Sequence, residues 1–203
     1  NHDPFHFLQG VRDVIGEGPL VGGTAIGVIT SDRAGYGGYE AGVAVVSSNR
    51  VRFDPVSVGE LKESEEMAGE RLGQMFASKR ADDTRAALLF YDSVKEPNPL
   101  RVNLATQLIH GVRNGLQGSD LPVLGGGMIK DYQWSGSHVF DGSAAMTQHA
   151  VGVLISGDCA VHHAISHGCE PASDYHTITS IEGPVVRADD RPAGALISSP
   201  VEH

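Results

Sequence analysis

The densest group of reactive side chains in this 203-residue chain lies in one short segment near its C-terminal end. The segment holds two thiols and three imidazoles, from Cys159, His162, His163, His167 and Cys169. Thiolate and imidazole are groups that bind zinc or haem iron. On a strand, His163 and His167 would share a face with both cysteines, but ligands two and four residues apart lie about 7 and 13 Å apart. Such spacing argues against one shared metal ion.

Several interpretations of this segment stay open. Its histidines are either half-exposed polar residues of an extended stretch, or one of His162, His163 and His167 is a single axial ligand of a haem. Cys169 is either a small buried apolar side chain or a thiol that lines a ligand cleft. Two cysteines form no disulfide framework, which favours a reducing cytoplasm, and the alternative is one disulfide between Cys159 and Cys169.

Glycines gather after apolar runs, at Gly22, Gly23, Gly125, Gly126 and Gly127. Their backbone amides could contact a ligand, or the missing side chains could let two parts of the chain pack closely. Nucleotide binding is not expected, because neither segment has the Gly-x-Gly-x-x-Gly spacing or a Lys-Ser/Thr ending. The chain also lacks the Gly-x-Ser-x-Gly and His-Glu-x-x-His signatures of common hydrolases, so no catalytic residue is predicted.

The composition excludes two classes of partner. Lys and Arg number 15 against 25 Asp and Glu, which gives a formal net charge of -10, and no basic patch breaks this balance. A nucleic-acid surface needs such a patch, so nucleic-acid binding is not expected. No apolar run approaches the roughly 20 residues that span a bilayer, so membrane insertion is not expected either.

An internal repeat is the main clue to the architecture. Residues 8–13 (LQGVRD), followed by 19–23 (PLVGG), resemble residues 108–114 (LIHGVRN), followed by 122–127 (PVLGGG). A long repeat that occurs twice predicts a duplication within a single domain, with related units at about 1–80 and 85–191. Two packed units commonly leave a cleft, where small ligands bind.

Apolar spacing and turn residues predict a mixed α/β fold with sheets inside and helices outside. Asp3-Pro4 and Asn98-Pro99 each look like a helix start, with a capping residue followed by proline. The predicted helices are residues 4–15, 60–79 and 98–115. The predicted strands are residues 40–47, 86–91, 122–130 and 149–157, one strand or two short ones within 19–29, and a hairpin over 175–188. A strand equivalent to 86–91 is missing before the first helix, so we expect the chain to begin inside its domain.

The ordered motifs resemble the FIST N-terminal domain family. Residues 21–29 (VGGTAIGVI) resemble its first glycine-rich signature, and residues 124–127 (LGGG) with Asp131 resemble its second. Residues 167–171 (HGCEP) resemble its Gly-Cys-x-Pro turn, and residues 177–183 (TITSIEG) resemble its closing hairpin. The match covers nearly the whole chain, we do not expect the companion C-terminal domain within these residues, and Ala172 and Ser173 replace a frequent glycine.

FIST domains are sensory modules of bacterial signalling proteins, and some relatives bind haem and sense nitric oxide. The resemblance implies a cytoplasmic signal-transduction domain that binds a small polar metabolite such as an amino acid. It also implies a signalling partner such as a histidine kinase or a chemotaxis component. Alternatives are a haem-based gas sensor that uses His162, His163 or His167, and an enzyme that acts through Cys169. The ligand-binding residues that the resemblance and the glycine pattern indicate are Gly22, Gly23, Thr24, Gly125, Gly126, Gly127, Asp131, His167, Cys169 and Thr179.

Overall fold

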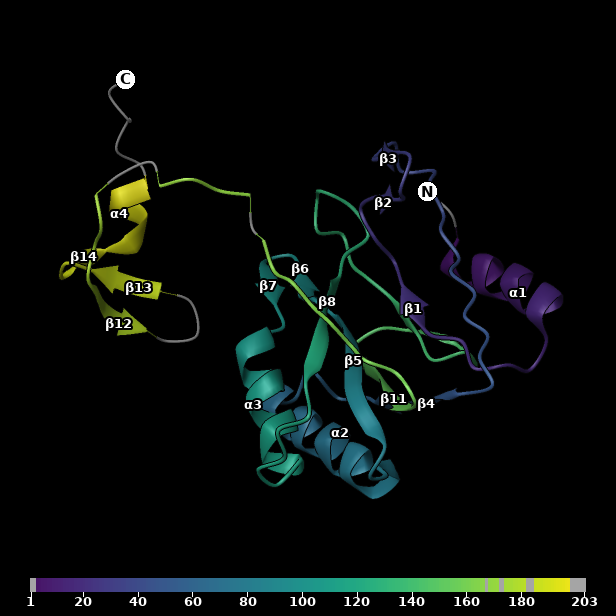
Figure 1. Ribbon diagram of the computed structural model, residues 1–203. Helices are drawn as coiled ribbons and strands as arrows, with labels where there is room; N and C mark the ends of the chain where they lie inside the picture. Colours follow the sequence, from purple (N-terminus) through teal and green to yellow (C-terminus); the bar gives the residue numbers. More distant parts are fainter. Residues whose placement is uncertain (1–2, 167, 172–173, 182–184, 198–203) are drawn as a thin grey trace. The chain divides into compact units, whose positions relative to one another are not determined.

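The chain folds into two compact units in the computed structural model, which describes residues 3–166, 168–171, 174–181 and 185–197 (Figure 1). Unit 1 is Asn1–Val161 and unit 2 is His162–His203. The fold is mixed α/β, which confirms the predicted class. The similar segments 8–13 and 108–114 both lie in helices, and each is followed by a glycine-rich strand. The assignment of 1–80 and 85–191 as duplicated units stays a prediction.

A four-stranded sheet forms the centre of unit 1, in the order β4 (Val51–Val58), β11 (Ala150–Gly157), β5 (Thr84–Asp92) and β8 (Val123–Met128). Strand β11 runs antiparallel to both of its neighbours, whereas β5 and β8 run parallel. Ala150 and Leu154 belong to the main core, while Val151 and Val153 alternate with them and are also buried. Strand β11 is therefore covered on both faces, which explains its almost continuous apolar sequence.

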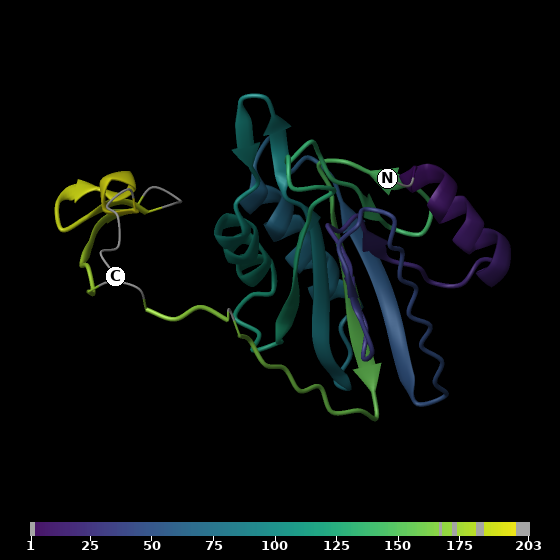
Figure 2. The same cartoon turned by 90° about the horizontal axis from the view of Figure 1, so that it is seen from above.

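Helices α2 (Glu65–Lys79) and α3 (Ala105–Gly115) lie side by side on one face of this sheet (Figures 1 and 2). Leu72 and Phe76 of α2 pack there with Leu108 and Val112 of α3, and all four are fully buried. A Cβ atom at Gly152 of β11 would lie 2.3 Å from the Phe76 ring. Glycine at this position thus lets the ring lie directly on the sheet.

The two helices touch backbone to backbone through glycines four residues apart. Gly69 and Gly73 of α2 face Gly111 and Gly115 of α3. A Cβ atom at Gly69 would lie 2.1 Å from the Leu108 carbonyl oxygen, and one at Gly111 would lie 2.0 Å from that of Glu66. Residues four apart share one face of a helix, so each glycine pair forms a smooth strip against which the other helix packs.

A second, smaller layer of unit 1 consists of β1 (Gly22–Gly23), β9 (Val139–Phe140) and β10 (Ala145–Met146), with helix α1 (Pro4–Ile15) packed on it. Leu8 of α1 forms a buried cluster with Phe140 and Ala145. The Asp3 carboxylate accepts hydrogen bonds from the amides of Phe5 and His6 at 2.9 and 3.0 Å, so the predicted cap and helix are confirmed.

Short elements complete both units. In unit 1, β2 (Val28–Ile29) pairs with β3 (Ala34–Gly35), and β6 (Val94–Pro97) forms a hairpin with β7 (Leu100–Val102). Residues 19–29 thus contain two short strands, which is one of the two predicted alternatives. In unit 2, β12 (Ile178–Ile181), β13 (Val185–Ala188) and β14 (Arg191–Pro192) form an antiparallel sheet beside α4 (Ala193–Ile197). The predicted hairpin over 175–188 is confirmed, and its turn lies outside the described residues.

The predicted strand over 40–47 is wrong. Residues 41–48 belong to no helix or strand, and Val43, Val45 and Val46 are 58%, 79% and 67% exposed. The β-branched run favours an extended backbone, but no strand among the described residues pairs with it. Because a strand needs a neighbour to satisfy its amides and carbonyls, composition alone does not produce one.

Two predicted helix starts are also wrong. Helix α2 begins at Glu65 rather than residue 60, because the Ser64 hydroxyl accepts a hydrogen bond from the Met67 amide and Glu60 has a positive φ of 68°. Helix α3 begins at Ala105 rather than residue 98. Asn98 and Pro99 form the turn between β6 and β7 instead, since Asn-Pro favours turns as well as helix starts. None of the described helices has both the length and the apolar character that a bilayer crossing requires.

We expect Gly111→Ala to lower the free energy of unfolding by at least about 2 kcal/mol, because the added methyl group would force the α2 and α3 backbones apart. The matched control is Gly10→Ala in α1, where an added Cβ atom meets nothing within 4 Å. There the higher helix propensity of alanine should add about 0.5–1 kcal/mol. Urea unfolding followed by circular dichroism measures both changes, and equal effects of the two substitutions would contradict the proposed helix contact.

Candidate functional site

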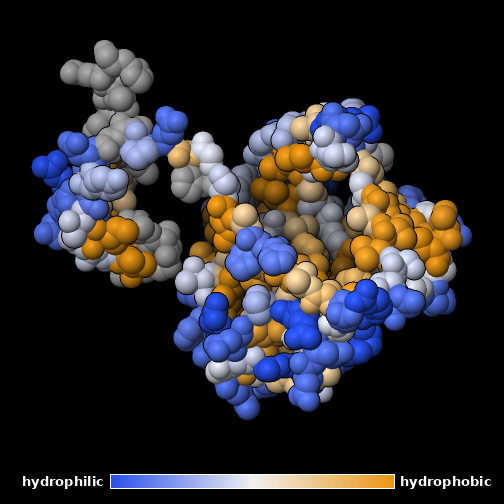
Figure 3. Space-filling view, in the orientation of Figure 1, coloured by the Kyte–Doolittle hydropathy of each residue, from blue (hydrophilic) through white to orange (hydrophobic). Residues whose placement is uncertain are grey.

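A cavity of about 380 Å³ lies in unit 1, where the start of α1 meets β1, β2 and residues 38–42. Its volume falls within the range of small-molecule pockets, about 300–1,000 Å³. In the space-filling view the surface near β1 and β2 is hollowed, with hydrophobic residues on either side (Figure 3). The lining residues are mostly apolar or glycine, and they include Phe7, Ile26, Val28 and Phe140 as apolar walls and Thr24, Glu40 and Lys130 as polar members.

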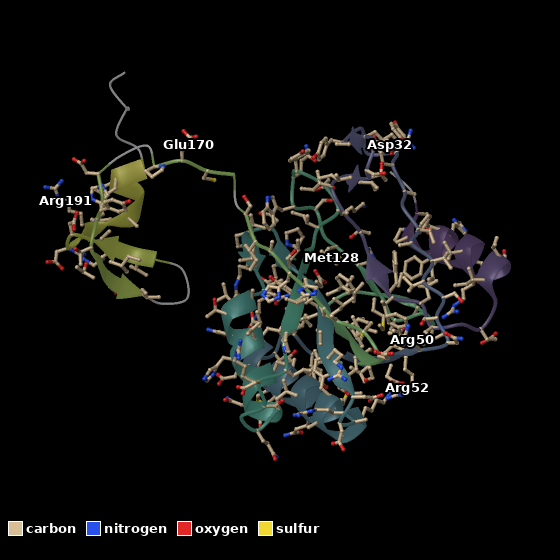
Figure 4. The ribbon with its side chains drawn as sticks, in the orientation of Figure 1. Asp32, Arg50, Arg52, Met128, Glu170 and Arg191 are labelled. Atoms are coloured by element: carbon tan, nitrogen blue, oxygen red, sulfur yellow. The ribbon has the colours of Figure 1, made fainter. Side chains whose placement is uncertain are left out.

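One wall of the cavity is fixed by Thr24. Its amide donates to the His138 carbonyl oxygen at 3.0 Å, and its hydroxyl oxygen accepts from the His138 amide at 3.0 Å. Its own carbonyl oxygen accepts from the Ile129 amide at 3.2 Å. Next to it, a Cβ atom at Gly23 would lie 2.4 Å from Cγ of Met128, a side chain at the end of β8 (Figure 4). Glycine is therefore needed where β1 crosses this side chain.

The two charged side chains of the cavity, Glu40 and Lys130, differ in the interactions that they make with the rest of the protein. The Glu40 carboxylate accepts hydrogen bonds from the amides of Gly37 and Tyr39 at 2.9 and 3.1 Å. The bond from Gly37 is the main reason why the pKa of Glu40 is lowered. Lys130, by contrast, forms no ion pair with any carboxylate in the described part of the chain. Lys130 therefore brings to the lining a positive charge that no described carboxylate holds in an ion pair, although this charge also helps to lower the pKa of Asp131.

A buried carboxylate lies behind this wall. Asp92, at the end of β5, is only 1% exposed and accepts from the amides of Val94 and Gln148 at 3.0 and 2.7 Å and from the Ser137 hydroxyl. Its carbonyl oxygen also accepts from the side-chain amide of Asn103 at 2.8 Å. Because Ser137 directly precedes His138, this network connects the cavity wall at Thr24 to the β6–β7 hairpin.

His138 lies next to the lining, bonded to Thr24, and favours the neutral form. Burial lowers its pKa, the positive charge of Lys130 acts in the same direction, and Asp92 and Asp3 oppose the shift. The Phe5 ring packs edge-on against the imidazole, with ring centres 5.8 Å apart. Nδ1 is buried without a hydrogen-bond partner among the described residues. A proton on this ring would therefore be poorly solvated.

Only two of the predicted ligand-binding residues, Gly23 and Thr24, line the cavity. Gly22 lies in β1 opposite Phe140, outside the lining. The run from Gly125 to Gly127 lies in β8 against β5, where a Cβ atom at Gly125 would lie 1.8 Å from the Leu89 carbonyl oxygen. At Gly125 the geometry supports the alternative interpretation, close packing of strands.

The other predicted ligand-binding residues that the structure describes do not line the cavity. Asp131 holds a turn, because its carboxylate accepts from the amides of Gln133 and Ser135 at 3.1 and 3.0 Å, and bonding to Ser135 lowers its pKa. In unit 2, the Thr179 hydroxyl oxygen accepts from the Asp190 amide at 3.1 Å, and Cys169 is exposed. His167 lies outside the described residues.

The described residues do not fit a haem site. His162 and His163 are exposed and lie in the stretch 159–166, which contains no strand, so the predicted arrangement of their side chains on strand faces is wrong. The lining of the cavity in unit 1 contains no His, Cys, Met or Tyr that could bind haem iron. Across the described part of the chain, no three His, Cys, Asp or Glu side chains gather as metal ligands would.

A second hollow in unit 1, of about 720 Å³, lies along α2 beside Gly59 and His149. Although it is larger, it is an open surface groove, and the guanidinium of Arg71 in its lining already pairs with Glu60. The cavity beside α1 is less open, and it combines apolar walls with a lysine that forms no ion pair among the described residues, which suits a small ligand better. We therefore assign the candidate site to the cavity beside α1.

Sequence reasoning missed Lys130, Glu40 and Ile26 of the cavity and Asp92 behind it. The signal for Lys130 was its place between the second glycine-rich strand and Asp131, at a strand end where ligand contacts are common. Asp92 follows an apolar strand in the same way. Nothing in the sequence shows that the Glu40 carboxylate accepts hydrogen bonds from two amides, or that Lys130 forms no ion pair with the described residues.

The fold and the cavity define an α/β domain with a pocket of small-molecule size. Comparison with protein-family models matches the FIST N domain over residues 1–188, so the chain belongs to the FIST N domain family. This family indicates a sensory domain of signal transduction. Searches of curated proteins and of solved structures found no match.

We expect Asp92→Asn to lower the free energy of unfolding by about 2–4 kcal/mol. The carboxylate faces three donors, so the new NH₂ group would meet a donor and leave it without an acceptor. Asp32→Asn is the control, because Asp32 is exposed and its replacement should change stability by less than about 0.5 kcal/mol (Figure 4). Chemical unfolding measures both, and a loss below about 1 kcal/mol at Asp92 would refute the importance of this network.

The lowered pKa of His138 predicts a pH dependence of stability. The unfolded histidine, with a pKa near 6.5, binds the proton more tightly than the folded one. Stability should therefore fall as the pH decreases below about 6.5, until the pKa of the folded state is reached. We expect His138→Gln to reduce the loss of stability between about pH 7 and about pH 5.5, and the exposed His163→Gln to leave it unchanged. Identical profiles for all three proteins would show that His138 carries no such penalty.

Proposed function

We propose that the chain is a sensory domain that binds a small organic metabolite in the cavity beside α1. The cavity itself is the observation that carries this proposal: it has the volume, apolar walls and few polar groups of a ligand site. An amino acid or a similar small metabolite is the ligand class that the family suggests. The proposal includes a cytoplasmic location and a signalling partner such as a histidine kinase or a chemotaxis component.

Binding would be reported by a shift in the population of wall conformations. Residues 23–29 and 38–42 supply most of the lining, and they come from short strands and loops rather than from the central sheet. The hydrogen bonds between Thr24 and His138 connect this wall to Ser137 and hence to Asp92. A ligand that favours one position of the wall thereby favours one arrangement of the Asp92 network.

The polar groups of the cavity support binding rather than turnover. The Thr24 hydroxyl oxygen accepts a hydrogen bond from the His138 amide, and the Glu40 carboxylate accepts bonds from two amides. A nucleophile needs a general base within hydrogen-bond reach, and the described lining shows no such pair around Thr24. The lining therefore favours recognition of a ligand that is released unchanged.

A thermal-shift screen of small metabolites tests this proposal. A ligand present at about 100 times its Kd should add about 2.7 kcal/mol to the free energy of unfolding and raise the Tm of the wild-type chain. Ala41→Trp should abolish that rise, because Ala41 lines the cavity and an indole would fill it. Ala81→Trp, in an exposed turn, is the control and should keep it. A compound that protects the Ala41→Trp protein as strongly as the wild type would place its site elsewhere.

A further inference from the structure

We propose that the ligand is a small organic acid whose carboxylate pairs with Lys130 and whose branched hydrocarbon tail packs against Phe7, Ile26 and Phe140. This inference rests on the proposed function, and it names the chemical class that the cavity selects.

The first argument is the charge of Lys130. None of the ion pairs among the described residues includes Lys130, although Glu40 lines the same cavity and the charge of Lys130 acts on the neighbouring Asp131. Glu40 is occupied by the amides of Gly37 and Tyr39. The oxygens of Asp131 are occupied by the amides of Gln133 and Ser135 and by the Ser135 hydroxyl. The cavity thus keeps a half-buried cation that is available to an anion.

The second argument is the apolar character of the walls. Pro4, Phe7, Ile26, Val28 and Phe140 present hydrocarbon, and the neighbouring glycines bring backbone rather than polar side chains to the surface. A ligand with several polar groups would lose hydrogen bonds to water without regaining them here. A hydrocarbon tail gains about 25 cal/mol for each Å² removed from water. One anionic end and one apolar end are therefore the combination that fits.

The third argument is the kind of group that Lys130 prefers. An ammonium beside it would be repelled, and a neutral amide would form a weaker hydrogen bond than a carboxylate does. The nearby His138 favours its neutral form, so it adds no second cation that a doubly charged phosphate would need. A monocarboxylate pairs with the single positive charge of Lys130, whereas a dianion would add repulsion from the Glu40 carboxylate in the same lining.

Three ligands of one carbon skeleton test this inference by isothermal titration against the full chain: 4-methylpentanoate, its neutral amide 4-methylpentanamide, and leucine, which adds an α-ammonium group to the acid. We expect 4-methylpentanoate to bind the wild type and the amide to bind roughly 10- to 100-fold more weakly. Leucine tests whether an ammonium group is tolerated or required.

Lys130→Met keeps the length of the side chain and removes its charge. It should weaken 4-methylpentanoate binding by roughly 10- to 100-fold while leaving the weak binding of the amide unchanged. Lys62→Met is the matched control, since Lys62 is an exposed residue paired with Glu96, away from the cavity lining, and it should bind all three ligands like the wild type. Circular dichroism and the Tm of each variant establish that it is folded.

The outcomes separate this inference from the proposed function. Equal binding of the acid and its amide, binding of leucine alone, or full binding by Lys130→Met would each overturn the carboxylate assignment. If none of the three ligands binds while the metabolite screen yields a compound that Ala41→Trp excludes, the carboxylate inference fails and the sensory proposal stands. If that screen also yields none, both fail.

Discussion

The structure of unit 1 depends on how one buried carboxylate is satisfied. Asp92 ends the strand β5, and its two oxygens accept hydrogen bonds from the start of β6, from Ser137 before β9 and from Gln148 before β11. A buried charge is tolerated only with such a full set of donors. The requirement brings together segments that lie 45 to 56 residues apart along the chain. Asp92 thereby connects the central sheet to the small layer that carries the cavity, beside other contacts such as the hydrogen bond from the Ile129 amide to the Thr24 carbonyl oxygen.

Glycine is the second constraint, and it acts differently in different places. Between α2 and α3 it permits contact of two backbones, and at Gly152 it permits a phenyl ring to lie on the sheet. At Gly23 it allows β1 to cross Met128 at the edge of the cavity. Only the last of these three uses borders the cavity, although the residue type is the same. A glycine-rich motif therefore indicates close approach, and only the surrounding atoms tell whether a ligand or another part of the chain approaches.

Features with causes close by in the sequence could be predicted, whereas features that depend on residues far along the chain could not. Helix α1 could be predicted to the residue because Asp3, Pro4 and the apolar spacing act within one turn of the chain. The strand predicted over 40–47 failed because pairing depends on a neighbour that composition does not reveal. In the candidate site, Gly23 and Thr24 were found through the glycine motif. Lys130 was missed because it stands out only through the lack of an ion-pair partner among the described residues of the cavity. That is a property of the fold and not of the sequence.

The cavity wall and the hydrogen-bond network of Asp92 are connected to each other through His138 and Ser137. Thr24 makes four hydrogen bonds with backbone groups, three of them with His138, so movement of the wall at Thr24 would displace His138, the residue after Ser137. Ser137 in turn donates to Asp92, whose remaining donors are the amides of Val94, at the start of β6, and of Gln148, just before β11 of the central sheet. Interactions of this kind are satisfied or broken as a set, because a partly satisfied buried carboxylate is costly. In the proposed sensory function, a small displacement at the cavity would therefore be converted into a choice between discrete arrangements of this network.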